Sequence, residues 1–237
     1  MPSWLEEYAP RRFDELAFNE KRRSVIESAA ISSNPPHILL AGPAGIGKTT
    51  AWRLMARQIL GPGWKSTTHI LQAKDLKGTS GAMANFENFL RPGGNSSSDT
   101  LAGRSSLDAF DSSIINASEN DPPPSGKERF NGESRAPISR LIIIEDADHL
   151  GPKRQPYLRR MMESNTHTSR FIFTARSPSR IIDALRSRTQ QVRIPATSTD
   201  QIISTLETIS RKNKLDVNKN LFGDIAHIVD GNLRRAI

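Results

Sequence analysis

A glycine-rich turn between an apolar segment and an amphipathic one limits this chain to a small set of folds. The sequence GPAGIGKTT, from Gly42 to Thr50, follows the apolar stretch HILLA and leads into TTAWRLMARQIL at 49–60. It fits the pattern G-x-x-x-x-G-K-[ST], which binds phosphate when a strand precedes it and a helix follows it. The apolar stretch reads as a buried strand and 49–60 as an amphipathic helix. The turn therefore predicts a nucleotide-binding α/β domain.

Each part of this phosphate loop has a chemical task. Glycines let the backbone N–H groups surround the phosphates, and the N-terminus of the following helix favours negative charge. Lys48 brings a mobile positive charge to the phosphates, and the hydroxyl of Thr49 is a ligand for Mg²⁺. We therefore predict that ATP or GTP binds with Mg²⁺ to a loop made of Gly42, Pro43, Ala44, Gly45, Ile46, Gly47, Lys48, Thr49 and Thr50.

A second part of the site is predicted at the end of another strand. The segment RLIIIEDADHL has four consecutive apolar residues followed by acids, a pattern typical of a central parallel strand. Such a strand usually ends in Asp-Glu, with the first acid near Mg²⁺ and the second polarising the attacking water. Here the order is Glu145-Asp146. A misplacement of about 1 Å can cost ~100-fold in rate, so we expect binding to tolerate this exchange better than hydrolysis.

The patterns on either side of a long polar region define the predicted domains. Apolar runs alternate with helical patterns as far as 196, and only helical patterns follow. This organisation favours a parallel-sheet α/β domain at 1–196 and a small all-helical lid at 197–237. The region at about 78–139 is rich in Pro, Gly, Ser and charge, and it is predicted as an exposed, partly disordered insertion with one helix at 104–115.

Composition excludes several classes of function. The chain has 33 Lys and Arg against 25 Asp and Glu, a net charge of +8, which suits either a nucleic-acid partner or a solvated basic surface. The absence of cysteine excludes disulfides, thiolate metal sites and cysteine nucleophiles. No apolar run approaches the ~20 residues of a membrane span, and the first residues lack the apolar core of a signal peptide. We expect a protein that is cytoplasmic, or nuclear in a eukaryote, and neither secreted nor bound to a membrane.

Seven segments, in order, resemble the small subunits of replication factor C, the AAA+ clamp loader. They are WLEEYAPRRFDEL, HILLAGPAGIGKTTA, LQAKDLKG, IIIEDADHL, LRRMMES, LRSRTQQVRIP and DGNLRRAI. Within that family the pattern resembles the more divergent second small subunit of some archaea. The resemblance implies an AAA+ fold and an ATPase that opens a ring-shaped sliding clamp and closes it on primer-template DNA. Its implied partners are the other clamp-loader subunits, the clamp and the DNA.

The resemblance also implies roles for individual residues. Glu145 matches the metal-side acid and Asp146 the water-side acid. Arg188 matches the arginine finger that one subunit inserts in trans into its neighbour's ATP site, where a cation stabilises the charge of the transferring phosphate. Arg234 matches a lid arginine that reaches the γ-phosphate, with Arg235 beside it as the alternative.

Several residues depart from the family's motifs. Arg176 stands where the family has an asparagine that orients the attacking water, and Ala9 replaces the arginine of the motif Y-R-P. Thr189 replaces the cysteine beside the finger arginine, while Gln72 and Leu76 interrupt the motif N-A-S-D-E. Together with the exchanged acids, these departures predict an ATPase whose intrinsic hydrolysis is weak.

Other interpretations stay open from the sequence. The chain is also compatible with a non-hydrolysing structural subunit that supplies only Arg188 in trans, or with another AAA+ DNA motor or initiator. The predicted helix at 104–115 sits where the family places a helix along the DNA backbone, although a solvent-facing insertion fits equally well. The family's small subunits continue into a helical collar that this sequence lacks, so we expect a truncated chain.

Overall fold

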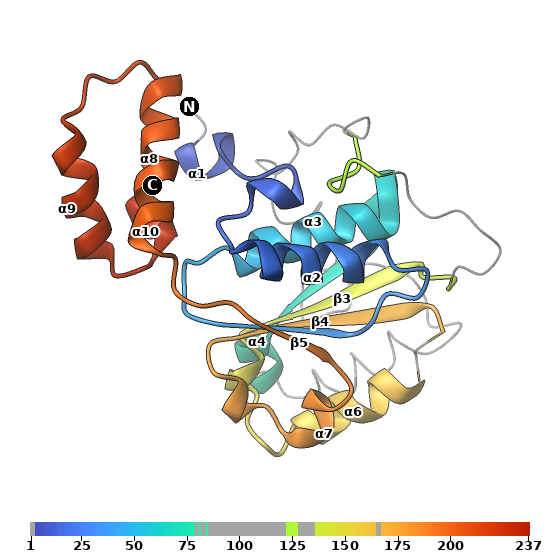
Figure 1. Ribbon diagram of the computed structural model, residues 1–237. Coiled ribbons are helices and arrows are strands. Elements are labelled where there is room, and N and C mark those ends of the chain that lie inside the picture. The colour runs from blue at the N-terminus through green and yellow to red at the C-terminus, as the bar shows by residue number, and fades with distance from the viewer. Residues whose placement is uncertain (1–2, 79–80, 82–83, 85–121, 128–135, 165–166) are drawn as a thin grey trace.

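A five-stranded parallel sheet lies at the centre of the molecule (Figure 1). The computed structural model describes residues 3–78, 81, 84, 122–127, 136–164 and 167–237. The strands lie in the order β2-β3-β4-β1-β5, and every neighbouring pair is parallel. Their bounds are β1 Ile38–Ala41, β2 Thr68–Gln72, β3 Arg140–Glu145, β4 Ser169–Ala175 and β5 Gln190–Arg193. The predicted α/β class with a parallel central sheet is confirmed.

Helices cover both faces of the sheet (Figure 1). A parallel sheet needs this cover because both of its faces are apolar and must be buried. One face packs against α2 Glu20–Ile31 and α3 Lys48–Leu60. The other packs against α4 Ala73–Gly78, α6 Gln155–Ser164 and α7 Asp183–Arg186.

Strand β3, which has a neighbour on each side in the sheet, shows why the apolar sequence requires helices on both faces. Ile143 packs into the cluster on the α3 side, whereas Ile142 and Ile144 pack into the cluster on the α6 side. All three are fully buried, and burial of each such side chain contributes roughly 1.5–3 kcal/mol. Because successive side chains point to opposite faces, an uninterrupted apolar run is what a strand covered on both sides requires.

Only helices follow β5 in the described part of the chain: α8 Thr199–Lys212, α9 Lys219–Val229 and α10 Leu233–Ala236. Helix α8 begins at a capping box, in which the Ser198 hydroxyl accepts the Gln201 N–H while the Gln201 side chain accepts the Ser198 N–H. The helices bury a cluster of their own, composed of Ile202, Leu206, Phe222, Ala226 and Val229.

The N-terminal segment contacts the end of α8. The short helix α1 Trp4–Glu7 precedes Tyr8, whose hydroxyl accepts a hydrogen bond of 2.8 Å from the Asn213 side chain. The Lys212 ammonium lies 5.4 Å from the centre of the Tyr8 ring, within the range of a cation–π contact. Two segments far apart in the sequence are thereby joined at the end of α8. No helix in the described ranges is long and apolar enough to cross a membrane.

Part of the polar insertion packs against the C-terminal end of α3 and the N-terminal segment rather than extending into solvent. The predicted helix at 104–115 lies outside the described residues, but 122–127 is described. There the Ser125 hydroxyl donates to the buried Gln58 side chain at 2.9 Å, and the Pro124 carbonyl accepts the Phe13 N–H. The sequence predicted an exposed loop at these positions, because composition alone does not reveal a tertiary partner such as Gln58.

A histidine with a lowered pKa lies at the amino end of β1. His37 directly precedes β1, and its Nδ1 accepts the Phe171 N–H at 3.0 Å. Burial, and after it the charge of Arg170, lowers the pKa of His37 from 6.5 to about 4. Between these two pH values the unfolded chain binds a proton that the folded chain does not.

The free energy of unfolding should therefore decrease as pH falls from 6.5 to about 4. His37→Asn, which cannot titrate, should make this decrease shallower, as measured by urea unfolding at a series of pH values. His167→Asn, at an exposed position, is the matched control and should keep the wild-type slope. An unchanged slope in the His37 variant would show that another group causes the pH dependence.

Candidate nucleotide-binding site

The predicted phosphate loop connects β1 to α3. Gly42 follows β1 and donates its N–H to the Ala175 carbonyl at 3.0 Å, while a Cβ added at Gly42 would lie only 2.1 Å from the Ile194 carbonyl oxygen. Ile46 is buried beneath the loop and anchors it to the core. Gly47, with φ of 98°, immediately precedes α3, so the loop ends at a helix N-terminus. This is a favourable environment for an anion.

The tip of the phosphate loop is exposed to solvent. Pro43 and Ala44 are exposed, and Thr50 is half-buried on the first turn of α3. The Lys48 ammonium folds over the loop and donates to the carbonyl oxygens of Gly42 and Pro43, at 2.7 and 2.6 Å. A flexible lysine held by two backbone acceptors can exchange them for phosphate oxygens.

Four charged groups act on Lys48. Burial is the main influence and lowers the pKa of Lys48; the carboxylates of Asp146 and Asp148 oppose this effect, whereas Arg176 and Arg234 add to it. The charges of the predicted residues Asp146 and Arg234 therefore act on the loop lysine. The charges of Arg176 and Asp148 act on it as well, although sequence reasoning assigned no site role to Asp148.

Glu145, the predicted metal-side acid, lies beside Thr49. The Thr49 hydroxyl donates to Oε1 of Glu145 at 3.2 Å, the Trp52 indole N–H donates to the same oxygen at 3.1 Å, and the Gln72 amide donates to Oε2 at 2.6 Å. A hydroxyl next to a carboxylate offers the hard oxygen ligands that Mg²⁺ prefers.

These residues fit Mg²⁺ in the manner of a nucleotide site. No cluster of three or more His, Cys, Asp or Glu suited to a metal occurs among the described residues. Mg²⁺ commonly binds through one or two protein groups together with substrate phosphates and water, so a site built on Thr49 and Glu145 needs no such cluster. When bound there, the ion would neutralise charge on the phosphates.

The two acids after Glu145 have unusual environments. Asp146 has left-handed backbone angles, φ 50° and ψ 44°, and its N–H donates to the Thr174 hydroxyl on the neighbouring strand. Asp148 is 8% exposed, and its Oδ1 has no hydrogen-bond partner in the part of the chain that the structure describes. A buried acceptor without a donor is costly, so the position of Asp148 requires a further partner or another explanation.

Helix α10 reaches the loop through backbone atoms. The Arg234 N–H donates to the Gly45 carbonyl at 3.0 Å. Asn232 caps α10 by accepting the Arg235 N–H, and its Oδ1 lies so close to Gly45 that an added Cβ would meet it at 1.8 Å. Of the two candidate lid arginines, Arg234 is the one whose charge acts on Lys48.

Arg188, the predicted trans finger, lies away from its own phosphate loop. It is followed by Thr189 and then by β5, whose first residue Gln190 pairs with Ile38 at the amino end of β1, whereas the loop follows the carboxyl end. Its guanidinium forms an ion pair of 2.7 Å with Glu163 at the surface. Although desolvation alone would raise the pKa of Glu163, the hydrogen bonds and charges of Arg159 and Arg188 lower it.

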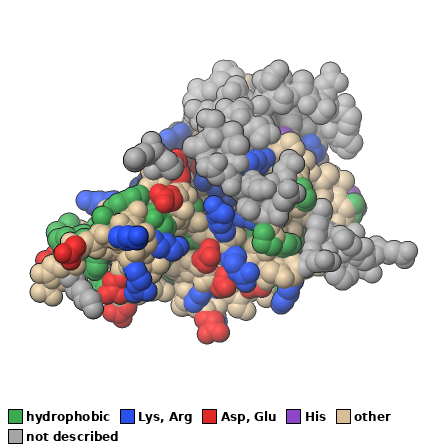
Figure 2. Space-filling view, turned by 90° about the horizontal axis from the view of Figure 1, so that it is seen from above, with side chains coloured by type: hydrophobic (Ala, Val, Ile, Leu, Met, Phe, Trp, Pro, Cys, Tyr) green, Lys and Arg blue, Asp and Glu red, His purple; other side chains and the backbone are tan. Residues whose placement is uncertain are grey.

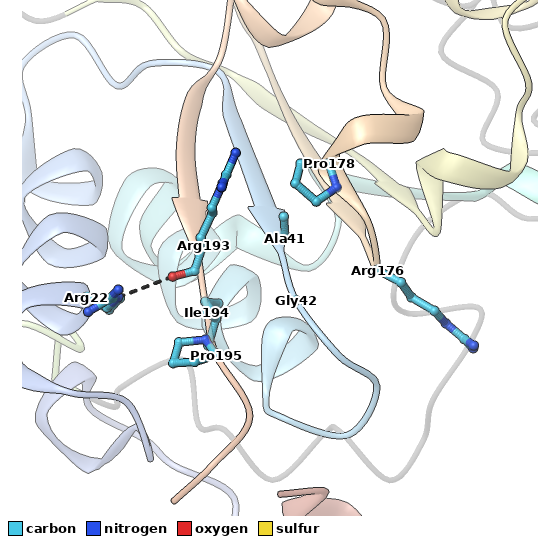
Figure 3. A pocket seen from close by; sticks show the side chains of 8 residues that line it. All are labelled: Arg22, Ala41, Gly42, Arg176, Pro178, Arg193, Ile194 and Pro195. Atoms are coloured by element: carbon cyan, nitrogen blue, oxygen red, sulfur yellow. Dashed lines mark hydrogen bonds between the residues drawn. The ribbon is translucent and has the colours of Figure 1, made fainter.

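A pocket of about 260 Å³ opens beside Gly42 (Figure 3). Arginines from three elements line it: Arg22 of α2, Arg176 at the end of β4 and Arg193 of β5. The Arg22 guanidinium donates to the Arg193 carbonyl at 3.3 Å. Figure 3 shows that the Arg176 side chain points away from Ala41, so this pocket is not a convergent arginine cluster.

The chain matches the family described as "ATPase family associated with various cellular activities (AAA)" over residues 38–195. The chain belongs to this AAA family. The matched residues include the five strands, the phosphate loop and the acids at the end of β3. The family match therefore includes Lys48, Thr49 and Glu145 of the candidate site.

Curated relatives resemble the chain over nearly its whole length. It is 28% identical to replication factor C small subunit 2 of Pyrobaculum islandicum and 29% identical to the replication factor C small subunit of Methanothermobacter thermautotrophicus, with 99% of this chain covered in both. The resemblance inferred from the seven motifs is confirmed. The chain spans 61% and 60% of the length of these two relatives.

Solved structures of Thermotoga maritima RuvB share the fold. The R170A variant superimposes with a TM-score of 0.64 at 15% identity, covering 97% of this chain and 63% of that one. At this identity the likeness concerns the fold alone.

Gly45→Ala should disturb the contact between loop and lid. A φ of 75° costs a non-glycine residue about 1–2 kcal/mol, and the clash with Asn232 adds to this. In urea unfolding, the substitution should cost less free energy in an Asn232→Ala background than in wild type. Gly63→Ala, where an added Cβ meets nothing within 4 Å, should change stability little. Equal costs in the two backgrounds would argue against the Asn232 contact.

Proposed function

We propose that this chain is an ATP-dependent subunit of a clamp loader that helps place a ring-shaped sliding clamp on primer-template DNA. The observation that carries the proposal is the joining of Lys48, Thr49 and Glu145 at one edge of the sheet with a lid helix bonded to Gly45. The names of the relatives, small subunits of replication factor C, supply the class of machine.

The proposed division of labour follows the positions of the residues. Residues 1–196 would form the nucleotide-binding domain and 197–237 the lid. Lys48 and the loop N–H groups would bind the phosphates of ATP, Thr49 and Glu145 would hold Mg²⁺, and Asp146 would orient the attacking water. Arg234 would report the state of the nucleotide to the lid.

Arg188 is proposed to act on a neighbouring subunit. It is 38% exposed and lies at the sheet edge opposite its own loop, so it is available to another chain's phosphate rather than to its own. A guanidinium of this kind stabilises the negative charge that spreads over a transferring phosphoryl group.

DNA is proposed as a partner on electrostatic grounds. The net charge of +8 favours a polyanion. Figure 2 shows Lys and Arg side chains across one face of the molecule with Asp and Glu interspersed, and apolar side chains gathered towards the helices after β5. Contacts of such basic side chains with the DNA backbone would position the subunit without reading its sequence.

A second candidate is a structural subunit that binds ATP without hydrolysing it. The order Glu145-Asp146 favours this alternative, because it leaves the shorter of the two side chains to orient the attacking water. Arg176 favours it too, since it places a positive charge at the end of β4 where a neutral polar group would orient water. In that case Arg188 would supply the subunit's only catalytic contribution.

ATP binding provides the direct test. Lys48→Ala should weaken binding of a fluorescent ATP analogue by about 10–100-fold, since a charge-assisted contact contributes ~1.5–3 kcal/mol. Lys153→Ala, at an exposed position, should bind as wild type does. Wild-type affinity in the Lys48 variant would contradict the proposed nucleotide site.

Hydrolysis in a reconstituted loader separates the two candidates. In a complex with the partner subunits, Arg188→Ala should reduce ATP turnover at the neighbouring site by at least ~1000-fold, as expected for an arginine finger. Loss of turnover in this subunit's own site on Glu145→Ala would favour the hydrolysing subunit. Unchanged turnover in the Glu145 variant would favour the structural one, and failure to retain the clamp in a pull-down would contradict both.

A further inference from the structure

The Glu145 carboxylate accepts hydrogen bonds from three side chains. Its Oε1 accepts from Thr49 and from the Trp52 indole N–H at 3.1 Å, and its Oε2 accepts from the Gln72 amide at 2.6 Å. The hydroxyl of Thr49 belongs to the phosphate-loop motif, but the other two donors do not.

Trp52 reaches Glu145 because of its place on α3. It lies three residues after Thr49, so the two side chains share one face of the helix. Its ring is fully buried, and the indole N–H is its only polar group and solely a donor. A buried donor of this kind requires an acceptor, and the one it has is the Glu145 carboxylate.

Gln72 reaches Glu145 from the neighbouring strand. The two residues are register partners at the ends of β2 and β3. Their side chains have equal length and run alongside each other, which brings the amide level with the carboxylate. Shortening either one alone would offset the two head groups by one methylene.

We infer that Trp52 and Gln72 are positioning residues that fix the Glu145 carboxylate for Mg²⁺. Trp52 donates to one carboxylate oxygen and Gln72 to the other, and this pair of bonds restrains rotation of the carboxylate. Thr49 donates to the same oxygen as Trp52. Partners of a metal ligand orient it, and their loss commonly weakens metal affinity by ~10–100-fold. The inference rests on the proposed ATP·Mg²⁺ site.

The test compares nucleotide binding with and without the metal. A fluorescent ATP analogue is titrated against the full chain in Mg²⁺ and in EDTA, and the ratio of the two Kd values gives the Mg²⁺ enhancement. Trp52→Phe and Gln72→Leu should each reduce this enhancement by about tenfold while leaving the Kd in EDTA unchanged. The matched controls Trp64→Phe and Gln58→Leu, buried residues without a contact to Glu145, should retain the wild-type enhancement.

The outcomes separate this inference from the proposed function. Wild-type enhancement in both the Trp52 and Gln72 variants would overturn the positioning role while leaving the nucleotide site intact. Absence of any ATP binding by the wild-type chain would overturn the proposed function and the inference with it.

A spectroscopic readout is independent of these variants' stability. The chain has three tryptophans, so its ¹⁵N–¹H spectrum should show three indole resonances. The Trp52 resonance, assigned by its loss in Trp52→Phe, should move upfield in Glu145→Ala but stay in place in Asp146→Ala. A Trp52 resonance that is the same in both variants would show that its indole does not bond Glu145.

Discussion

The parallel register of the sheet determines where the polar groups of the site lie. Ala41 pairs with Ala175, so Gly42 and Arg176 leave neighbouring strands at the same level. Gln72 pairs with Glu145 at the ends of β2 and β3. A slip of one residue would bring Glu145 or Arg140, the charged ends of β3, into its fully buried part, so the packing that excludes water also fixes the positions of the acids.

The parts of the candidate site that are coded locally could be predicted from the sequence. The phosphate loop was predictable because its glycine spacing, the strand before it and the helix after it lie within one short segment. Glu145 was predictable because an apolar run followed by acids marks the end of a central strand. Thr49 contacts Glu145 although the two are 96 residues apart in the sequence. They meet because β1 and β3 belong to one parallel sheet, so their carboxyl ends lie on the same side of it.

The parts that escaped prediction depend on contacts between distant segments. Sequence reasoning assigned no role to Trp52, because nothing nearby in the sequence indicates that its indole N–H meets an acid. It assigned none to Asp148 or Asn232 either. The segment 122–127 has the composition of a free loop, yet Gln58 supplies it with a partner.

The bond between the Gly45 carbonyl and the Arg234 N–H uses main-chain atoms only. Every residue except proline can supply that N–H, so the mechanical link between loop and lid is insensitive to the side chain at position 234. The charge at that position can therefore change during evolution without uncoupling the lid. In the clamp-loader subunit proposed above, the contact between α10 and the phosphate loop would therefore persist even if the arginine side chain at position 234 were lost.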